Sequence, residues 1–155
     1  MIPHPFPHRN EGILFDHAGS GFVSWIVLPG ALELFILAQA GGGGGGAGFS
    51  RAAATAGGGG GGGGSGGKSL LRVPVLFLPP VLYVRVGAGG LSGTIGGFTN
   101  VAIRPNPANE SHQLIRASAG SPGGNGTAAA LGAAGAAGAV IPQASNMSVG
   151  QAGVS

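Results

Sequence analysis

The stretch VSWIVLPGALELFILAQAGGGGGG, residues 23–46, determines the fold class of this 155-residue chain. Two short runs of Val, Ile, Leu and aromatic residues flank Pro29-Gly30, and a glycine run follows directly. Short runs of this composition, separated by turn residues, are typical of β-strands, whereas a helix needs about ten uninterrupted residues. The stretch therefore predicts a strand, a proline turn, a second strand and a glycine loop.

A second stretch, LRVPVLFLPPVLYVRVGAGG at residues 71–90, repeats this order with Pro79-Pro80 at the turn. We therefore predict two hairpins, residues 22–40 and 70–86, that form the apolar core of one domain. The expected fold class is all-β: a small β-sandwich or jelly-roll-like domain with long glycine-rich loops, some of them polyproline-II-like. Because Pro cannot donate a ladder hydrogen bond, Pro74 is expected in an edge strand or just before a strand begins.

Alternation along the predicted strands selects the candidate core residues. Side chains 32, 34 and 36 share one face of their strand, and side chains 33, 35 and 37 share the other. Glu33 is then expected near the rim of the domain or against a neighbouring subunit, because burying an unpaired charge is costly. The residues expected in the core are Trp25, Phe35, Leu37, Leu76, Leu82 and Val84.

Glycine makes up 36 of the 155 residues, and its spacing is a second signal. Between residues 120 and 138 glycine recurs at multiples of three, with one break at Ala129. Each interior glycine costs a helix about 1 kcal/mol, whereas a polyproline-II conformation repeats every third residue and lets glycine approach a neighbouring backbone. We predict that conformation or an extended loop for residues 120–138, with the glycines facing an adjacent backbone. The denser run at residues 41–67 also fits a flexible linker between two strand-rich pieces.

Composition and charge argue against several function classes. Charged residues make up 7% of the chain, and the seven basic residues do not cluster in the sequence, so no phosphate-binding patch for nucleic acid is expected. Residues 22–40 are about long enough to cross a membrane, but Pro29-Gly30 and Glu33 interrupt them. We therefore expect no membrane span, and the prolines near the N-terminus predict no signal peptide. Without cysteine, the chain has neither disulfides nor thiolate metal ligands.

Two short motifs match functional patterns without their structural context. Residues 62–69 satisfy the phosphate-loop pattern, yet its glycines come from a glycine run and Pro74 excludes the helix that should follow. His4 and His8 have the spacing of metal ligands on a helix face, but the prolines between them exclude that helix. We expect no enzymatic activity, no catalytic residue, no cofactor and no metal site.

The N-terminal sequence MIPHPFPHR, residues 1–9, predicts an extended arm. Its prolines lower the entropy lost on ordering, and Phe6 offers an apolar anchor on a neighbouring subunit or another protein. The expected attachment residues are Pro3, Pro5, Phe6 and Pro7. The expected division of the chain is an arm at 1–19, a glycine-rich β domain at 20–140 and a C-terminal tail at 141–155.

Four motifs follow one another in a recognisable order: Trp25 with Leu28-Pro29-Gly30, the glycine run 41–46, VGAGG at 86–90 and AGSPGGNG at 119–126. Over about residues 20–140 this order resembles the glycine-rich domain of bacteriophage tail-fibre and other virion structural proteins. Pro79-Pro80 departs from that family's pattern, which usually has proline-glycine at the second turn.

The resemblance implies a non-catalytic, β-rich virion protein at the particle surface, a tail-fibre or adhesin-like component of the tail that contributes to assembly and host attachment. It implies a homo-oligomer, a trimer, in contact with other virion proteins and a bacterial surface receptor. With no long shaft in the chain, a capsid decoration or cement protein or a collar protein stays open. A self-assembling glycine-rich extracellular protein is a further alternative, which requires an export signal that the sequence does not show.

Overall fold

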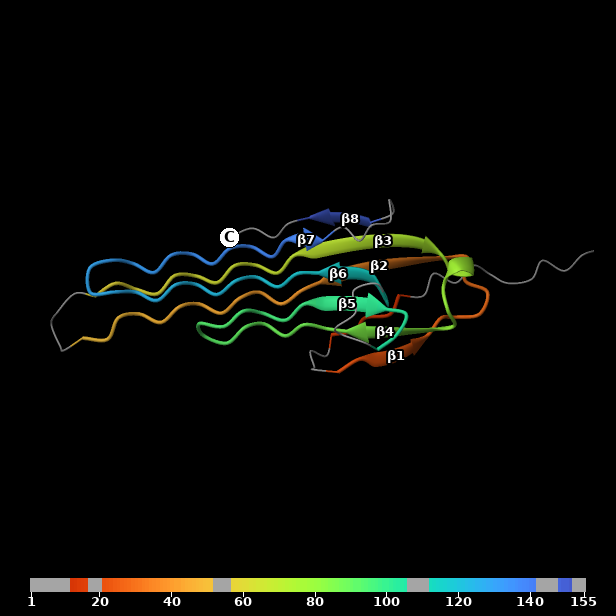
Figure 1. Ribbon diagram of the computed structural model, residues 1–155, viewed down its shortest axis with the longest axis horizontal. Helices are drawn as coiled ribbons and strands as arrows, with labels where there is room; N and C mark the ends of the chain where they lie inside the picture. The colour runs from red at the N-terminus through yellow and green to blue at the C-terminus, as the bar shows by residue number, and fades with distance from the viewer. Residues whose placement is uncertain (1–11, 17–20, 52–56, 106–111, 142–147, 152–155) are drawn as a thin grey trace, which may run out of the picture.

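The computed structural model describes residues 12–16, 21–51, 57–105, 112–141 and 148–151. Its strands are β1 (Val23–Ile26), β2 (Glu33–Gln39), β3 (Lys68–Pro74), β4 (Val81–Arg85), β5 (Thr99–Ala102), β6 (Gln113–Ala117), β7 (Val140–Ile141) and β8 (Ser148–Gln151), and a short 3-10 turn, η1 (Val75–Phe77), follows β3. They form two antiparallel sheets, a larger one in the order β1-β4-β5-β6-β7 and a smaller one in the order β2-β3-β8 (Figure 1). The described part of the chain is thus all-β, as its sequence predicts.

Residues 23–49 and 58–84 form one long antiparallel ribbon and not two hairpins. β1 pairs with β4 and β2 pairs with β3. The register of this pairing does not shift along the ribbon: the numbers of two paired residues always add up to 107, from Val23 opposite Val84 to Phe49 opposite Gly58. Both predicted hairpins are therefore wrong: the two similar segments pair with each other, and each proline turn carries the chain from one sheet to the other.

The two proline turns lie side by side at the corner of this ribbon. Val27 donates its N–H to the carbonyl of Pro80, and Val75 donates to the carbonyl of Leu32, each at 2.9 Å. Because these bonds link the two turns to each other, both chains of the ribbon change sheet at the same place. The ribbon can then fold one apolar face onto another, which separate hairpins within one sheet would not allow.

Gly30 occupies the first of these corners with a φ of 86°, while Ala31 donates to the carbonyl of Leu28 at 3.3 Å. We expect Gly30→Ala to lower the free energy of unfolding by about 1–2 kcal/mol, because a Cβ at positive φ crowds the following carbonyl. Denaturant unfolding measures the loss. Gly21→Ala is the matched control, since a Cβ there meets no atom within 4 Å. Equal losses in both variants would contradict a special role for Gly30.

One apolar core lies between the two sheets. Leu82 and Val84, both expected there, are buried, and Trp25 is half-buried against this core. Other buried residues of the core come from both sheets: Ala38, Leu71 and Val73 from the smaller one, and Val101, Ile115 and Ala117 from the larger one. The two sheets therefore belong to a single packed unit.

Three of the expected core residues are exposed, and the prediction for them is wrong. The exposed fractions are 62% for Phe35, 70% for Leu37 and 89% for Leu76. β2 alternates as predicted, but its inward face carries the even-numbered residues of the range 34–38. Both faces of β2 are apolar, so the pattern alone does not select the inward one, and Leu76 lies in η1 and not in a strand.

Two predicted boundaries also differ from the structure. β3 is the middle strand of its sheet and ends at Pro74, so the proline neither marks an edge strand nor precedes the strand. β8 pairs only with the first residues of β3, Lys68 to Leu71, so Pro74 lies beyond that ladder and withholds no N–H from it. The segment predicted as a C-terminal tail supplies Ile141 of β7 and all of β8, so the domain continues past residue 140.

Candidate functional site: the glycine bundle

Six glycine-rich segments extend from one end of the two sheets and form what we call the glycine bundle (Figure 1). In chain order, the first to sixth segments are residues 41–49, 57–67, 87–91, 94–98, 118–127 and 130–139. Each is continuous with a strand: the first follows β2, the second precedes β3, the third follows β4, the fourth precedes β5, the fifth follows β6 and the sixth precedes β7. None of these residues belongs to a helix or a strand.

Backbone hydrogen bonds join neighbouring segments at every third residue. Four residues of the second segment each donate an N–H to the fifth segment and accept an N–H from residues 40–49 at their carbonyl: Gly58, Gly61, Gly64 and Gly67. The sixth segment donates to the second from Gly132, Gly135 and Gly138. A repeat of three is the period of a polyproline-II helix, whereas a strand repeats every two residues and an α-helix every 3.6. The segments thus keep the register of the strands that they continue, while the spacing between hydrogen-bonded residues becomes three.

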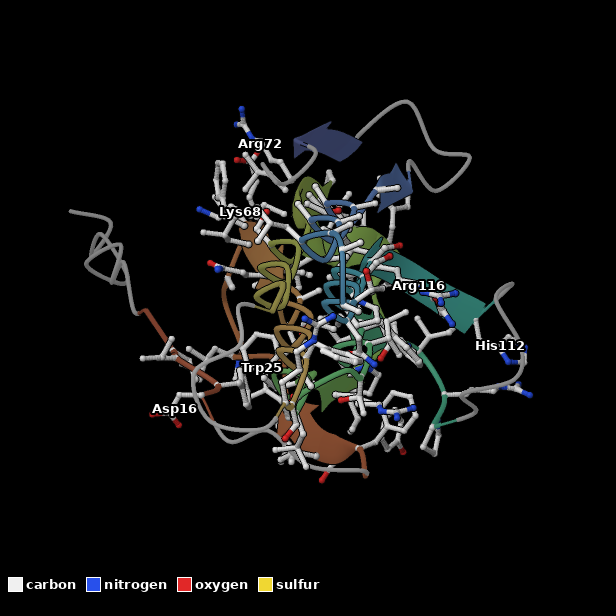
Figure 2. The ribbon with its side chains drawn as sticks, turned by 90° about the vertical axis from the view of Figure 1, so that its left-hand side faces the viewer. Asp16, Trp25, Lys68, Arg72, His112 and Arg116 are labelled. Carbon is white, nitrogen blue, oxygen red and sulfur yellow. The ribbon has the colours of Figure 1, made fainter. Side chains whose placement is uncertain are left out.

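The segments lie in two layers that continue the two sheets. The first and second segments extend the smaller sheet, and the third to sixth extend the larger one. Hydrogen bonds cross between the layers, for example from the second segment to the fifth and from the fifth to the first. Figure 2 looks along the bundle from its far end and shows the orange and yellow segments of one layer beside the blue and teal segments of the other. Backbone hydrogen bonds therefore join the two layers of the bundle, whereas apolar side chains join the two sheets.

Close approach of these backbones explains why the second segment is almost pure glycine. A Cβ on Gly61 or Gly64 would collide with a carbonyl of the sixth segment, and a Cβ on Gly63 would collide with a carbonyl of the first. At Gly62 a Cβ would meet no atom within 4 Å, and Ser65, one repeat further on, carries a side chain. Two of every three positions in this segment therefore require glycine.

The sixth segment requires glycine at one position in three. In the sixth segment, a Cβ on Gly132, Gly135 or Gly138 would collide with a carbonyl of the fifth. The alanines between them have room, and Ala133 and Ala134 are exposed. The prediction that these glycines face an adjacent backbone and do not form an α-helix is confirmed. The positions at which a Cβ would collide thus determine the pattern of each segment, G-x-x in the sixth and G-G-x in the second.

Side chains close the far end of the bundle. Thr127 Oγ1 accepts the N–H of Ala130 at 3.0 Å, and the N–H of Thr127 donates to the carbonyl of Ala130, which reverses the chain between the fifth and sixth segments. Arg51 Nη2 donates to the carbonyl of Ala128 at 3.1 Å, and the Arg51 guanidinium lies 5.3 Å from the ring centre of Phe49. This end, which we call the tip, thus presents an aromatic and a basic side chain on fixed backbone.

No protein-family model, no curated protein and no solved structure matches the chain. Within the described ranges, no three potential metal ligands gather, and no helix has the length and hydropathy to cross a membrane. The phosphate-loop match at 62–69 leads from the second segment into β3 and not from a strand into a helix, and its Ser69 hydroxyl donates to the carbonyl of Arg116 at 2.8 Å. The predicted attachment residues lie outside the described residues, and so do the two histidines beside them: Pro3, Pro5, Phe6 and Pro7, with His4 and His8.

Asn125 is a structural residue of the bundle that was not predicted from the sequence. Its Oδ1 accepts the N–H of Ala47 at 2.9 Å and so joins the fifth segment to the first near the tip. Ser92, at the turn between the third and fourth segments, donates its hydroxyl to the carbonyl of Gly45 at 3.1 Å. A polar side chain at a position that interrupts a glycine repeat is the sequence signal for such contacts.

A pocket of about 440 Å³ lies beside β2, between the two sheets and residues 12–15. Apolar side chains such as Trp25 and Ile36 form most of its wall. The hydroxyl of Thr99 is already bonded: it donates to the carbonyl of Gln39 at 2.7 Å and accepts the N–H of Gly87 at 2.9 Å. Among the described residues that line the pocket there is no Asp, Glu, His, Lys or Arg, so these residues offer no group for acid–base catalysis.

Proposed function

We propose that the chain is a non-enzymatic structural protein of a bacteriophage particle, a tail-fibre or adhesin-like component that contributes to assembly and host attachment. The observation that supports this most is the glycine bundle, an extension built on backbone hydrogen bonds that ends in exposed side chains. At the rise of a polyproline-II helix, residues 58–67 span roughly 30 Å. Such an extension holds a contact surface away from the sheets without a large apolar core.

In this proposal the two sheets form a β-sandwich and the six glycine segments are polyproline-II-type helices. The apolar core that both sheets share supports the first assignment. The three-residue period of the hydrogen bonds supports the second.

The proposal includes a homo-oligomer, a trimer, in contact with other virion proteins. The outer face of the smaller sheet supports it, because Phe35, Leu37 and Leu70 are exposed there and Leu37 lies opposite Leu70 in register. Burial of such an apolar face against symmetric copies would stabilise the assembly.

The position and copy number of the chain on purified particles test the function. Quantitative mass spectrometry gives the number of copies, and labelled antibody in electron microscopy gives their place. For a tail-fibre component we expect label at the tail and a small copy number set by tail symmetry. Hundreds of copies over the capsid would instead show a decoration protein, and a chain absent from the particle would contradict a virion function.

The tip gives a more local prediction for host attachment. Phe49 and Leu131 are exposed at the tip, and replacing both by Ser should reduce adsorption of particles to host cells at least about tenfold, as removal of central contact residues does in protein interfaces. The melting temperature should stay nearly unchanged, because neither side chain is buried. Leu76→Ser is the matched control, since Leu76 is exposed in η1 at the opposite end of the molecule (Figure 1). Equal adsorption by both variants would argue against the tip as the contact surface.

A further inference from the structure

The outer face of β4, β5 and β6 carries a row of polar side chains. Arg85, Asn100 and Arg116 lie opposite one another in register on the three strands, so their side chains project from the same face. Phe98, two residues before Asn100, joins them: its ring centre lies 4.4 Å from the guanidinium carbon of Arg85 and 4.5 Å from that of Arg116. Two arginines distant in sequence thus stack on one aromatic ring.

Asn100, in the middle of this row, is fully buried and has an unpaired amide. Its exposed fraction is 0%, and neither Nδ2 nor Oδ1 makes a hydrogen bond. Buried polar groups in proteins are nearly always bonded, because leaving one unpaired is costly. The amide therefore has a donor and an acceptor available to a ligand that reaches it.

The smaller sheet shows a similar arrangement that a carboxylate completes. The guanidinium of Arg72 lies 5.2 Å from the ring centre of Phe35, and it donates to Glu33 Oε2 from Nε at 2.9 Å and from Nη2 at 2.6 Å. The only other acid in the described ranges is Asp16, which Figure 2 shows on the far side of the molecule from Arg116. The described residues therefore supply a carboxylate to Arg72 and none to Arg85.

We propose that Arg85, Phe98 and Asn100 form a binding site for a carboxylate group, carried by an acidic sugar or by a small free carboxylate, with Arg116 stacked on the same ring. A guanidinium binds a carboxylate through two parallel hydrogen bonds, and stacking on Phe98 fixes the plane of the Arg85 group. Asn100 Nδ2, unpaired and opposite Arg85 in register, is a further hydrogen-bond donor for the ligand. Tyr83, on the same face of β4, adds a hydroxyl that suits a sugar.

This site lies on the larger sheet and not at the tip, so it does not depend on the proposed role in attachment. Its ligand class follows from the comparison with Arg72. In that arrangement a guanidinium stacked on a phenylalanine ring binds a carboxylate, and Arg85 is stacked on Phe98 in the same way.

An NMR titration of the ¹⁵N-labelled full chain tests the site with three probes: sodium glucuronate, sodium acetate and glucose. Glucuronate should shift the side-chain signals of Asn100 and Arg85 in a saturable manner, and glucose should not. Tighter binding of glucuronate than of acetate identifies an acidic sugar as the ligand. Equal binding of the two shows that the site binds the carboxylate alone.

Arg85→Gln should weaken binding of glucuronate at least about tenfold, because a charge-assisted bidentate contact is lost. Arg72→Gln is the matched control on the other sheet and should leave binding unchanged. Arg85→Lys keeps the charge without the planar fork and should bind at an intermediate strength, which provides a second test if Arg85→Gln does not fold. The proposal is overturned if neither carboxylate gives a saturable shift, if glucose binds as glucuronate does, or if the folded Arg85 variant binds normally.

Discussion

Replacing Gly61 and Gly64 together by Ala is expected to unfold the glycine bundle, with a loss of at least about 4 kcal/mol in the free energy of unfolding. Each new Cβ would collide with a backbone carbonyl, that of Ala133 for Gly61 and that of Ala136 for Gly64. A backbone carbonyl cannot rotate away as a side chain can. Both carbonyls also accept N–H groups of the fifth segment, so a shift of the sixth segment would break a second set of contacts.

The matched control replaces Gly59 and Gly62 in the same segment. A Cβ on Gly59 would lie 3.9 Å from Cδ2 of Leu131, and a Cβ on Gly62 would meet nothing within 4 Å. We expect this variant to keep its stability or to gain about 0.4–1 kcal/mol per site, because Ala restricts the unfolded chain more than Gly does. Denaturant unfolding followed by circular dichroism compares the two variants. Similar losses in both would contradict the close packing of the segments.

Leu82→Ala should be the most destabilising single truncation in the core, at about 2–5 kcal/mol. Leu82 has an exposed fraction of 0% and lies in the shared core of both sheets, so its loss leaves a cavity that neighbouring strands cannot fill. Leu76→Ala removes the same atoms from an exposed site in η1 and should change stability by no more than about 0.5 kcal/mol. Thermal or denaturant unfolding measures both. A comparable loss at Leu76 would show that the surface of η1 is buried in solution.

Strands β1 to β4 could be predicted from the sequence, but their pairing and the strands β5 to β8 could not. Runs of Val, Ile, Leu and aromatic residues mark β2, β3 and β4 correctly, because strand propensity is local. Which strands pair depends on contacts between residues far apart in sequence, and the same local pattern fits two hairpins or one long ribbon. The inward face of β2 had the same ambiguity, since Phe35 on one side and Ile36 on the other are both apolar.

The glycine bundle could be predicted in part. The three-residue spacing at Gly132, Gly135 and Gly138 indicated a backbone neighbour, because only every third residue of such a segment faces it. The denser run at 41–67 hid the same period, since it fills the positions that need glycine and also some that do not. Ser65 is the one residue in the second segment that shows where a side chain fits.

The carboxylate site had no sequence signal, because the basic residues are dispersed along the chain. Arg85 and Arg116 belong to different strands, and only the register of β4, β5 and β6 brings them to one ring. The absence of a basic run in the sequence therefore did not exclude a basic cluster on the sheet.

Amide hydrogen exchange along residues 57–67, measured by NMR, tests the central claim most directly. The N–H groups of Gly58, Gly61, Gly64 and Gly67 donate to the fifth segment, whereas those of Gly59, Gly60, Gly62 and Gly63 have no hydrogen-bond acceptor. We predict slow exchange at the first set and fast exchange at the second, a protection pattern with a period of three residues. Fast exchange at all of these glycines would show a flexible linker and contradict the glycine bundle.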